Sequence, residues 1–355
     1  MKSSLRANGP VLMVDWLGRG GIAHCTEEWV HELRAAGESV ELVTRSGREL
    51  VTAVSGSREA GGRGSALTEY LAVVATARRI ARELDPRVVV LNGTVLPQVE
   101  LGLLRASQRR NSTVIFVAHE PAPPHNVPGS HRALARLIRA ADVVITHTAF
   151  VADNVSALTG RHDLKILPLP IPVGLIAGGL GAVPVVELSA VPLALMFGNL
   201  HRTYKGSTMV EEVAVRGVDG WRFALVGKGA PVLLPGATTV SRFLESGELV
   251  ATVSSSAATL LPYTRASQSA AVVLAQAVGS VVVATSVGGI PEQVENRVTG
   301  RLLPLGAGVE CWRDVLIELS DPEERAQLAA AARSSVERAH VEFTAGVLKI
   351  VGAVR

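Results

Sequence analysis

The sequence predicts an α/β protein made of two similar domains, each with a parallel sheet covered by helices on both faces. Three observations support this. Short apolar runs alternate with helical stretches of about 10–15 residues along most of the chain. The alternation stops over residues 167–192, which are rich in proline and glycine and nearly free of charge, and then restarts. The 355 residues also suffice for about two domains of ordinary size.

The first half of the chain alternates five strands with three helices. We expect strands at residues 11–16, 39–44, 87–93, 112–120 and 142–148, and helices at 23–37, 68–84 and 131–141. Parallel strands need crossover helices, so this order is typical of a Rossmann-like domain.

The second half repeats the pattern. We expect strands at 193–199, 221–229, 258–263 and 281–286, and helices at 209–215, 269–278 and 323–339. The predicted domains are therefore residues 1–172 and 185–340, with a C-terminal helix, 341–355, that packs on the first domain. Ligands of such domains bind at the carboxyl ends of the strands, so we expect both sheets to face a central cleft.

The composition indicates a well-buried globular protein, with 48% hydrophobic and 19% charged residues. A net charge of +3 is too small to indicate a nucleic-acid partner, but it is compatible with anionic substrates or contact with an anionic membrane surface. The two cysteines form no disulfide framework or zinc pattern, which favours a reducing compartment. The N-terminus lacks the apolar run of a signal peptide, and the uncharged residues 270–290 are interpreted as a buried helix and strand rather than a membrane span.

A glycine-rich stretch, DWLGRGGIAHCT, joins the first strand to the first helix at residues 15–26. Gly18, Gly20 and Gly21 would let a ligand approach the backbone, and the N–H groups of a helix start suit an anion. The match to a dinucleotide fingerprint is loose, because Ala23 replaces the third glycine and Arg45 stands where an acid is usual. A tight turn without a ligand is the alternative.

His119 stands at the end of the predicted strand 112–120. A histidine at the carboxyl end of a parallel strand can bind a sugar hydroxyl or transfer a proton. The alternative is a histidine with a purely structural role.

The stretch GNLHRTYKGS, residues 198–207, places two cations after the strand 193–199. Arg202 can form two hydrogen bonds to a phosphate, and Lys205 adds a point charge, so the pair suits a diphosphate. A second anion-binding feature follows in LPYTRASQS, where Ser267, Gln268 and Ser269 introduce an apolar helix near Ala270. A solvated basic loop and a plain helix cap are the alternatives.

These motifs together resemble the GT-B glycosyltransferases, specifically the retaining, nucleotide-sugar-dependent family four. The resemblance covers nearly the whole chain. It is carried by MFGNLHRTYKG, ALVGKG, LLPYTRASQS, AVGSVVVATSVGGIPEQV and VTGRLLP in the second half and by GRGGIAHCTEEWVHELRAAGESVELVT in the first.

The resemblance implies a role for each motif. A donor diphosphate would be bound by Arg202 and Lys205, in a loop that also contains Gly198 and Asn199, and by the helix start at Gln268, Ser269 and Ala270. Gly20 and Gly21 would close on the donor, and His119 would lie near the transferred sugar as the catalytic residue. The family's chemistry uses no metal and no cofactor, which agrees with the lack of a carboxylate metal motif here.

The chain departs from the family pattern at two positions. The paired glutamates that often contact the donor sugar and ribose would fall at Ala266 and Leu274. Glu292 or Gln276 would be the nearest substitutes. Because of this departure, one alternative is a non-catalytic nucleotide-sugar-binding or partner protein with the same fold. A second alternative, a nicotinamide-dependent dehydrogenase, is supported only by Gly18 and Gly20.

The expected function is transfer of a sugar, with retention, from a UDP or GDP sugar to an acceptor hydroxyl. The acceptor is a glycan, a lipid-linked sugar or a small natural product, and it contacts loops such as 45–65 and 120–130. No nucleic-acid partner is expected. The expected location is the cytoplasm, with peripheral contact at the inner face of the membrane.

Overall fold

The computed structural model describes residues 9–46, 58–60, 65–123 and 128–354. The chain divides into two compact units: unit 1 comprises residues 1–170 and 340–355, and unit 2 comprises residues 171–339. Each unit is built around one parallel sheet.

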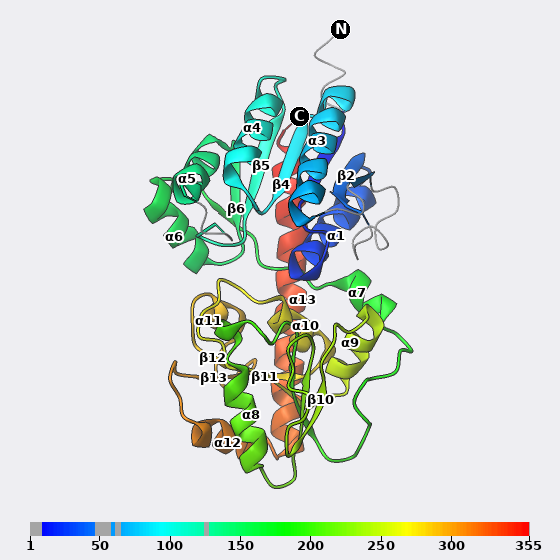
Figure 1. Ribbon diagram of the computed structural model, residues 1–355, viewed down its shortest axis with the longest axis vertical. Helices are drawn as coiled ribbons and strands as arrows, with labels where there is room; N and C mark the ends of the chain where they lie inside the picture. Colours follow the sequence, from blue (N-terminus) through cyan, green and yellow to red (C-terminus); the bar gives the residue numbers. More distant parts are fainter. Residues whose placement is uncertain (1–8, 47–57, 61–64, 124–127, 355) are drawn as a thin grey trace. The chain divides into compact units, whose positions relative to one another are not determined.

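Unit 1 contains a seven-stranded sheet in the order β3-β2-β1-β4-β5-β6-β7 (Figure 1). Its five central strands are rich in valine, leucine and isoleucine because both of their faces are buried. They are β1 (Val11–Asp15), β2 (Val40–Arg45), β3 (Arg58–Ala60), β4 (Val88–Asn92), β5 (Thr113–Ala118), β6 (Val143–Thr146) and β7 (Lys165–Ile166).

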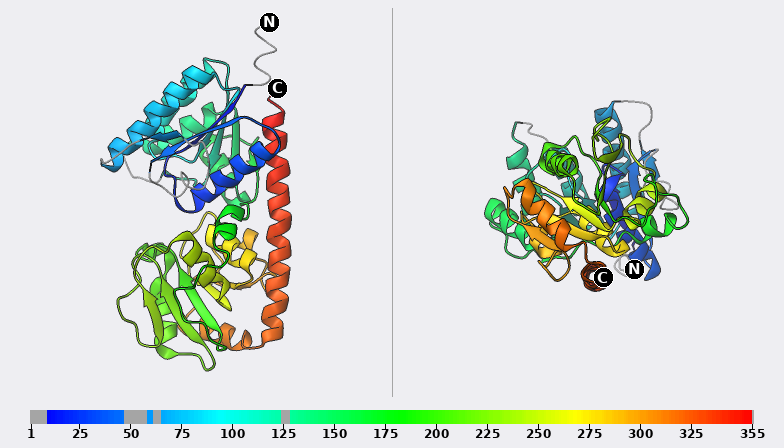
Figure 2. Two further views of the ribbon diagram at one scale, coloured as in Figure 1. Left: turned by 90° about the vertical axis from the view of Figure 1, so that its right-hand side faces the viewer. Right: turned by 90° about the horizontal axis from the view of Figure 1, so that it is seen from below.

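Helices cover both faces of this sheet (Figure 2). One face packs against α3 (Ala66–Leu84), α4 (Pro97–Gln108), α5 (Ser130–Ala140) and α6 (Ala149–Thr159) in a single apolar core. The opposite face is covered by α1 (Gly20–Ala35) and by the last part of α13 (Pro322–Gly352). There the Trp29 ring packs edge-on against Phe343, with ring centroids 5.9 Å apart.

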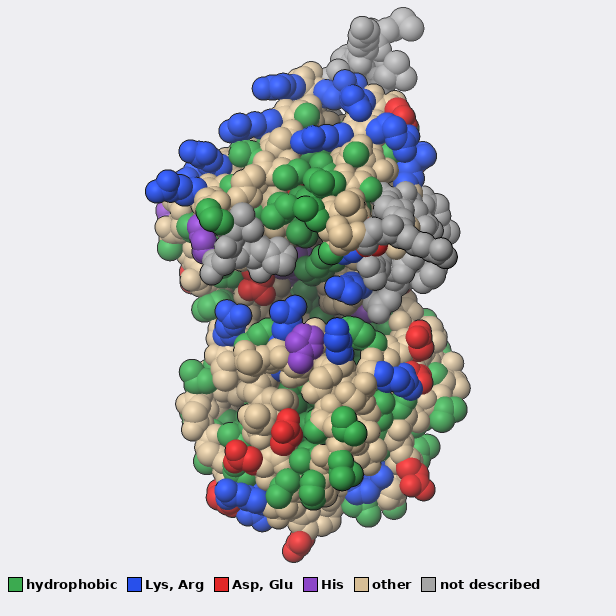
Figure 3. All heavy atoms as spheres, viewed as in Figure 1, with side chains coloured by type: hydrophobic (Ala, Val, Ile, Leu, Met, Phe, Trp, Pro, Cys, Tyr) green, Lys and Arg blue, Asp and Glu red, His purple; other side chains and the backbone are tan. Residues whose placement is uncertain are grey.

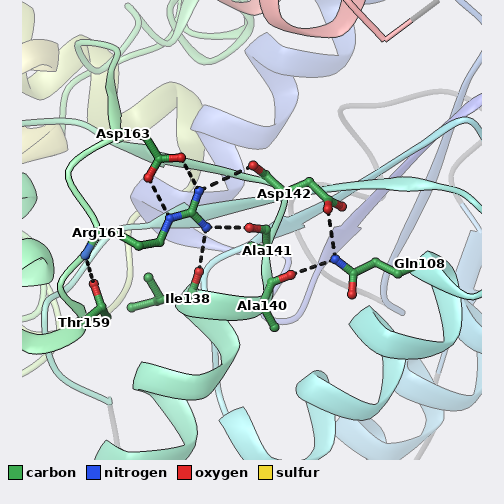
Figure 4. Close-up of polar contacts among 8 residues, drawn as sticks. All are labelled: Gln108, Ile138, Ala140, Ala141, Asp142, Thr159, Arg161 and Asp163. Carbon is green, nitrogen blue, oxygen red and sulfur yellow. Dashed lines mark hydrogen bonds and ion pairs between the residues drawn. The ribbon is translucent and has the colours of Figure 1, made fainter.

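A single arginine fixes the end of α5 in unit 1 (Figure 4). The Arg161 guanidinium donates to the carbonyl oxygens of Ile138 and Ala141 at 2.9 and 2.5 Å, and to both carboxylate oxygens of Asp163. It thereby satisfies carbonyls that a helix C-terminus leaves open. The same interaction lowers the pKa of the exposed Asp163 carboxyl to about 2, because Arg161 donates hydrogen bonds to its charged form.

Unit 2 contains a six-stranded sheet in the order β10-β9-β8-β11-β12-β13. Its strands are β8 (Leu193–Phe197), β9 (Arg222–Val226), β10 (Ala237–Val240), β11 (Ala258–Leu261), β12 (Val281–Thr285) and β13 (Arg301–Leu303). One face packs on α8 (Ser207–Arg216), α12 (Val309–Glu318) and the start of α13. The other packs on α7 (Val173–Gly178), α9 (Ser246–Ser254), α10 (Ala270–Val278) and α11 (Ile290–Gln293).

Helix α13 contributes to both units, because its residues up to 339 belong to unit 2 and those from 340 belong to unit 1. The sequence suggested one helix ending near 339 and a separate C-terminal helix at 341–355, whereas the structure has one continuous helix of 31 residues. Phe343, Val347 and Val351 are buried, and the Arg87 side chain donates to the Val351 carbonyl at 3.1 Å. No helix in the described part of the chain is long and apolar enough to cross a membrane.

The predicted α/β fold of two Rossmann-like domains is confirmed, and all nine predicted strands exist. The sheets also contain four strands that the sequence analysis did not predict: β3, β7, β10 and β13. Each has only two to four residues, too few to show a pattern of buried and exposed positions. Helix α1 begins at Gly20 rather than near Ala23, so Gly20 and Gly21, expected in a loop, lie in its first turn, whereas Gly18 precedes the helix.

Candidate functional site

The strands of unit 1 place four polar residues at their carboxyl ends. Asp15 ends β1, Asn92 ends β4, His119 follows β5 and His147 follows β6. These strands are neighbours in the sheet, so their ends lie side by side. All four side chains are buried, with at most 6% of their surface exposed.

Hydrogen bonds connect Asp15, Asn92 and His119: Thr26 of α1 links Asp15 to Asn92, and Asn92 contacts His119 directly. Thr26 Oγ1 donates to Asp15 Oδ2 at 2.7 Å, and Asn92 Nδ2 donates to Thr26 Oγ1 and to the Ile22 carbonyl. Since the Asn92 amide nitrogen is used this way, its Oδ1 accepts from His119 Nε2 at 2.7 Å. The network therefore fixes the orientation of His119 and links it to the first turn of α1, where Gly20 and Gly21 lie.

A second histidine stacks against the first. The rings of His119 and His147 have centroids 4.9 Å apart. His147 Nδ1–H donates to the Leu167 carbonyl at 2.8 Å, which leaves Nε2 as an acceptor 3.8 Å from Cys25 Sγ. Burial lowers the pKa of His147 to about 4, and burial together with His147 lowers the pKa of His119 well below its ordinary value. Both rings are therefore neutral at pH 7, and because His119 Nε2–H donates to Asn92, the other ring nitrogen, Nδ1, is a hydrogen-bond acceptor.

Asp15 closes the network at the start of the glycine-rich stretch. Its Oδ1 accepts the backbone N–H groups of Leu17 and Gly18 at 2.8 and 2.6 Å. Burial raises the pKa of the Asp15 carboxyl, against these hydrogen bonds and the one from Thr26. The carboxylate thus shapes the turn that leads into α1.

In unit 2 a short 3₁₀ helix, η1 (Thr203–Lys205), follows β8; Lys205 is its last residue and Arg202 is its N-cap. The Lys205 ammonium donates to Tyr263 Oη at 2.9 Å and lies 4.6 Å from the centroid of that ring. The ammonium also lies close to Gly198, since a Cβ built on that glycine would be 3.6 Å from Lys205 Nζ. Arg202 is exposed. The structure thus brings Lys205 to Gly198 and to the end of β11.

Asn199 supplies an unsatisfied acceptor in the same loop. Its Oδ1 is buried and accepts no hydrogen bond from the described residues. A buried polar oxygen without a donor costs free energy, and a ligand hydroxyl or amide can satisfy it.

The loop at Lys205 fits against the end of β11 only because residue 206 is a glycine. Gly206 has φ of 67°, and a Cβ there would lie 2.1 Å from the Pro262 carbonyl oxygen. The Thr264 N–H donates to the Tyr204 carbonyl at 2.8 Å and joins the two segments. The close approach of these backbones positions Lys205 on Tyr263.

The start of α10 lies after the same strand. Ser269 is its N-cap and accepts from the Val272 N–H at 3.4 Å, while its own N–H donates to Gln293 Oε1 at 2.7 Å. The Ser269 N–H is therefore already used within the protein. Ala270 and Ala271 follow it in the first turn, where backbone N–H groups suit an anion.

The structure also locates the positions that replace the paired glutamates. Leu274 is buried in the core of unit 2, and Ala266 packs beside that core. Gln276 is a structural residue, because its amide donates to the Gln293 carbonyl at 3.0 Å. Glu292 is exposed.

Basic side chains gather on the loops that follow the strands of unit 2 (Figure 3). They belong to the segments after β8, β9, β10 and β11, and they are His201, Arg202, Lys205, Lys228, Arg242 and Arg265. Arg242 forms an ion pair with Glu248 at 2.7 Å. The remaining positive charge in these loops favours an anionic ligand.

One group in the described residues could hold a metal ion: Glu28 and Glu32 of α1 with His340 of α13, whose ligand atoms lie within 4.8 Å of one another. It contains none of the predicted site residues. Of the expected acceptor loops 45–65 and 120–130, residues 47–57, 61–64 and 124–127 lie outside the described residues.

Sequence reasoning missed Asp15, Asn92, His147 and Tyr263 as members of the site. A signal was present for each, since each is a polar residue at the end of an apolar strand. What the sequence did not contain was the pairing between them.

Solved structures with the same fold include several glycosyltransferases. HepE of Anabaena, crystallised with UDP-glucose, is 16% identical with a TM-score of 0.74, and the match covers 97% of this chain and 100% of that one. Sucrose-phosphate synthase from Thermosynechococcus elongatus is 15% identical with a TM-score of 0.73, covering 96% and 97%. WaaG, a glycosyltransferase involved in lipopolysaccharide biosynthesis, is 13% identical with a TM-score of 0.66, covering 96% and 100%. The comparison with curated proteins found no match.

Two family models match consecutive parts of the chain. The model described as a glycosyl transferase 4-like domain matches residues 20–172, and the model described as glycosyl transferases group 1 matches residues 191–322. Together they span most of the chain, in the order of its two units. On this evidence the chain belongs to the GT-B glycosyltransferases and is itself a glycosyltransferase.

Proposed function

We propose that this glycosyltransferase moves a sugar from a UDP or GDP sugar to an acceptor hydroxyl, with retention of anomeric configuration and without a metal ion. The observation that carries the proposal is the arrangement in unit 2, where Lys205, the unsatisfied Asn199 and the start of α10 lie at adjacent strand ends. HepE, which shares the fold, was crystallised with UDP-glucose and with UDP.

The diphosphate is the part of the donor that these residues suit best. Lys205 is oriented by Tyr263, so little side-chain freedom is lost when it binds a phosphate oxygen. Arg202 adds a planar donor in the same loop, and the N–H groups at Ala270 and Ala271 add the positive end of a helix. Gly198 leaves room for the phosphates beside Lys205 Nζ. These groups stabilise the negative charge that develops on a departing diphosphate, which is the task a metal ion would otherwise perform.

His119 is proposed as the catalytic residue of unit 1. Its neutral ring, fixed by Asn92, would hydrogen-bond a hydroxyl of the transferred sugar rather than bind the diphosphate. Gly20 and Gly21 form the first turn of α1 and would approach the donor through their backbone.

The acceptor is proposed to be a glycan, a lipid-linked sugar or a small natural product, and the enzyme is proposed to work in the cytoplasm with peripheral contact at the inner membrane face. The positive net charge of the chain supports contact with an anionic surface.

Nucleotide sugars test the donor directly. UDP and GDP should each be added during thermal unfolding, since a ligand that binds only the native state raises its stability. UDP-sugars and GDP-sugars should then be tested for hydrolysis, with and without EDTA, and the anomer formed should be read by NMR. No thermal shift with either nucleotide at millimolar concentration would refute the proposal. Binding without turnover of any donor would instead favour a non-catalytic role.

A further inference from the structure

The outer faces of α3, α4 and α5 carry far more positive charge than the rest of the protein. Nine arginines and only two exposed carboxylates lie within residues 78–85, 105–110 and 131–139. The whole chain has a net charge of only +3. The two carboxylates, Glu83 and Asp85, are each paired with one arginine, Arg79 and Arg110. We call this surface the arginine face.

Most of these arginines have no carboxylate partner. Six of them are exposed and form no ion pair with the described residues: Arg78, Arg82, Arg105, Arg109, Arg132 and Arg136. Arg78 and Arg82 contact backbone carbonyls instead, those of Val99 and Arg78. The acidic side chain on α4, Glu100, is buried and accepts from Tyr70 Oη and from the N–H groups of Val95 and Leu96. The charge is therefore available to an external anionic partner.

The three helices form one continuous surface, because α4 packs between α3 and α5. Arg78 reaches from α3 to α4, where its guanidinium lies beside Gly102. Figure 3 shows Lys and Arg side chains on this part of unit 1, with hydrophobic side chains among them over α3 and α4.

Leucines extend the arginine face along α3. Leu67 and Leu71 are 55% and 45% exposed, and they lie four residues apart. With Ala75, Arg78 and Arg82 they follow the helical repeat, so they share the outer side of α3. The opposite side of this helix, with Val73, is buried in the core. An outer side that combines leucines with arginines suits the boundary between lipid headgroups and acyl chains.

We propose that the arginine face docks on an anionic lipid bilayer, with the arginines on the headgroups and Leu67 and Leu71 in the boundary region. This inference rests on the peripheral membrane contact proposed above and assigns it to a surface. Nucleic acid would also match the charge, but phosphate contacts would make no use of exposed leucines.

Vesicle flotation tests the proposal with the full chain. One set of vesicles is phosphatidylcholine alone, and the other contains equal parts phosphatidylcholine and phosphatidylglycerol. We expect binding to the anionic vesicles, weaker at high salt, and none to the neutral ones. The triple variant R105Q/R109Q/R136Q should bind about 100-fold more weakly, since one arginine near an anionic surface contributes about fivefold. The variant L67Q/L71Q should also bind more weakly and keep the salt dependence.

A matched variant separates this surface from total charge. R216Q/R297Q/R338Q removes the same charge from exposed arginines of unit 2 and should bind almost as well as the unchanged protein. Equal losses in both triple variants would overturn the proposal, as would equal binding to neutral vesicles. Binding of duplex DNA without binding of vesicles would overturn it in favour of nucleic acid. The UDP thermal shift and donor hydrolysis in solution should be unchanged in both triple variants, so a failure of the enzymatic proposal is recognised separately.

Discussion

Replacement of Gly206 by alanine should damage the proposed diphosphate site through the backbone alone. Two costs apply. An L-residue at φ of 67° costs about 1–2 kcal/mol. The new Cβ would also lie 2.1 Å from the Pro262 carbonyl oxygen, so the loop and the end of β11 must separate by about an ångström. Such overpacking costs about 1–3 kcal/mol more.

Gly220→Ala provides the control. Gly220 lies in the same unit and has φ of 79°, but its Cβ would meet nothing within 4 Å. This variant should therefore lose only the conformational part, about 1–2 kcal/mol. In differential scanning fluorimetry, roughly 2–4 °C per kcal/mol converts the total cost of about 2–5 kcal/mol for Gly206→Ala into a fall in Tm of about 4–20 °C, against about 2–8 °C for Gly220→Ala.

The same variant tests function. Separation of the loop from β11 pulls Lys205 away from Tyr263, to which it donates at 2.9 Å. The UDP affinity measured by calorimetry should fall at least tenfold, or about 1.4 kcal/mol, whereas Gly220→Ala should bind normally. Equal Tm shifts in the two variants, with unchanged UDP affinity, would refute the reasoning.

Four further predictions follow from the two sites. Lys205→Ala should weaken UDP binding by about 1.5–3 kcal/mol, the range of a charged hydrogen bond, and an unchanged Kd in calorimetry would remove Lys205 from the site. Tyr263→Phe should weaken the same binding less, because it removes only the hydroxyl that orients Lys205; a loss as large as that of Lys205→Ala would contradict this. Thr26→Val should lower the free energy of unfolding by about 1–3 kcal/mol in urea, since it leaves Asp15 and Asn92 each short of a partner. Thr238→Val, at an exposed position of β10, should change the free energy of unfolding by no more than about 0.5 kcal/mol. The pKa of His147 is lowered in the folded state, so below pH 6.5 the unfolded chain binds the proton more readily than the folded chain. The free energy of unfolding should therefore fall by up to about 3 kcal/mol as the pH drops towards 4. His147→Gln should make this fall smaller, and an identical pH profile in the variant would exclude His147 as its source.

The fold was predictable because it depends on patterns within short segments. Strands such as β1 and β4 are continuous apolar runs, and the helices between them show a clear repeat. The candidate site depends on partners that are distant in sequence: His119 and Asn92 are 27 positions apart, and Lys205 and Tyr263 are 58 apart. A pattern within a short segment cannot show which residues at such separations come into contact. The sequence located Lys205 as a cation after a strand, but only the parallel arrangement of β8 and β11 shows that a tyrosine orients it.

Helix α13 gives unit 1 an unusual dependence on the order of synthesis. Phe343, Val347 and Val351 fill the surface against which Trp29 packs, although more than 160 residues of unit 2 separate them from β7. A ribosome that has just synthesised the first 170 residues has therefore made a sheet on which α1 alone covers this face, while the part that α13 covers is still exposed. That part of the face stays open to chaperones, proteases and neighbouring chains until the last turns of α13 have been synthesised.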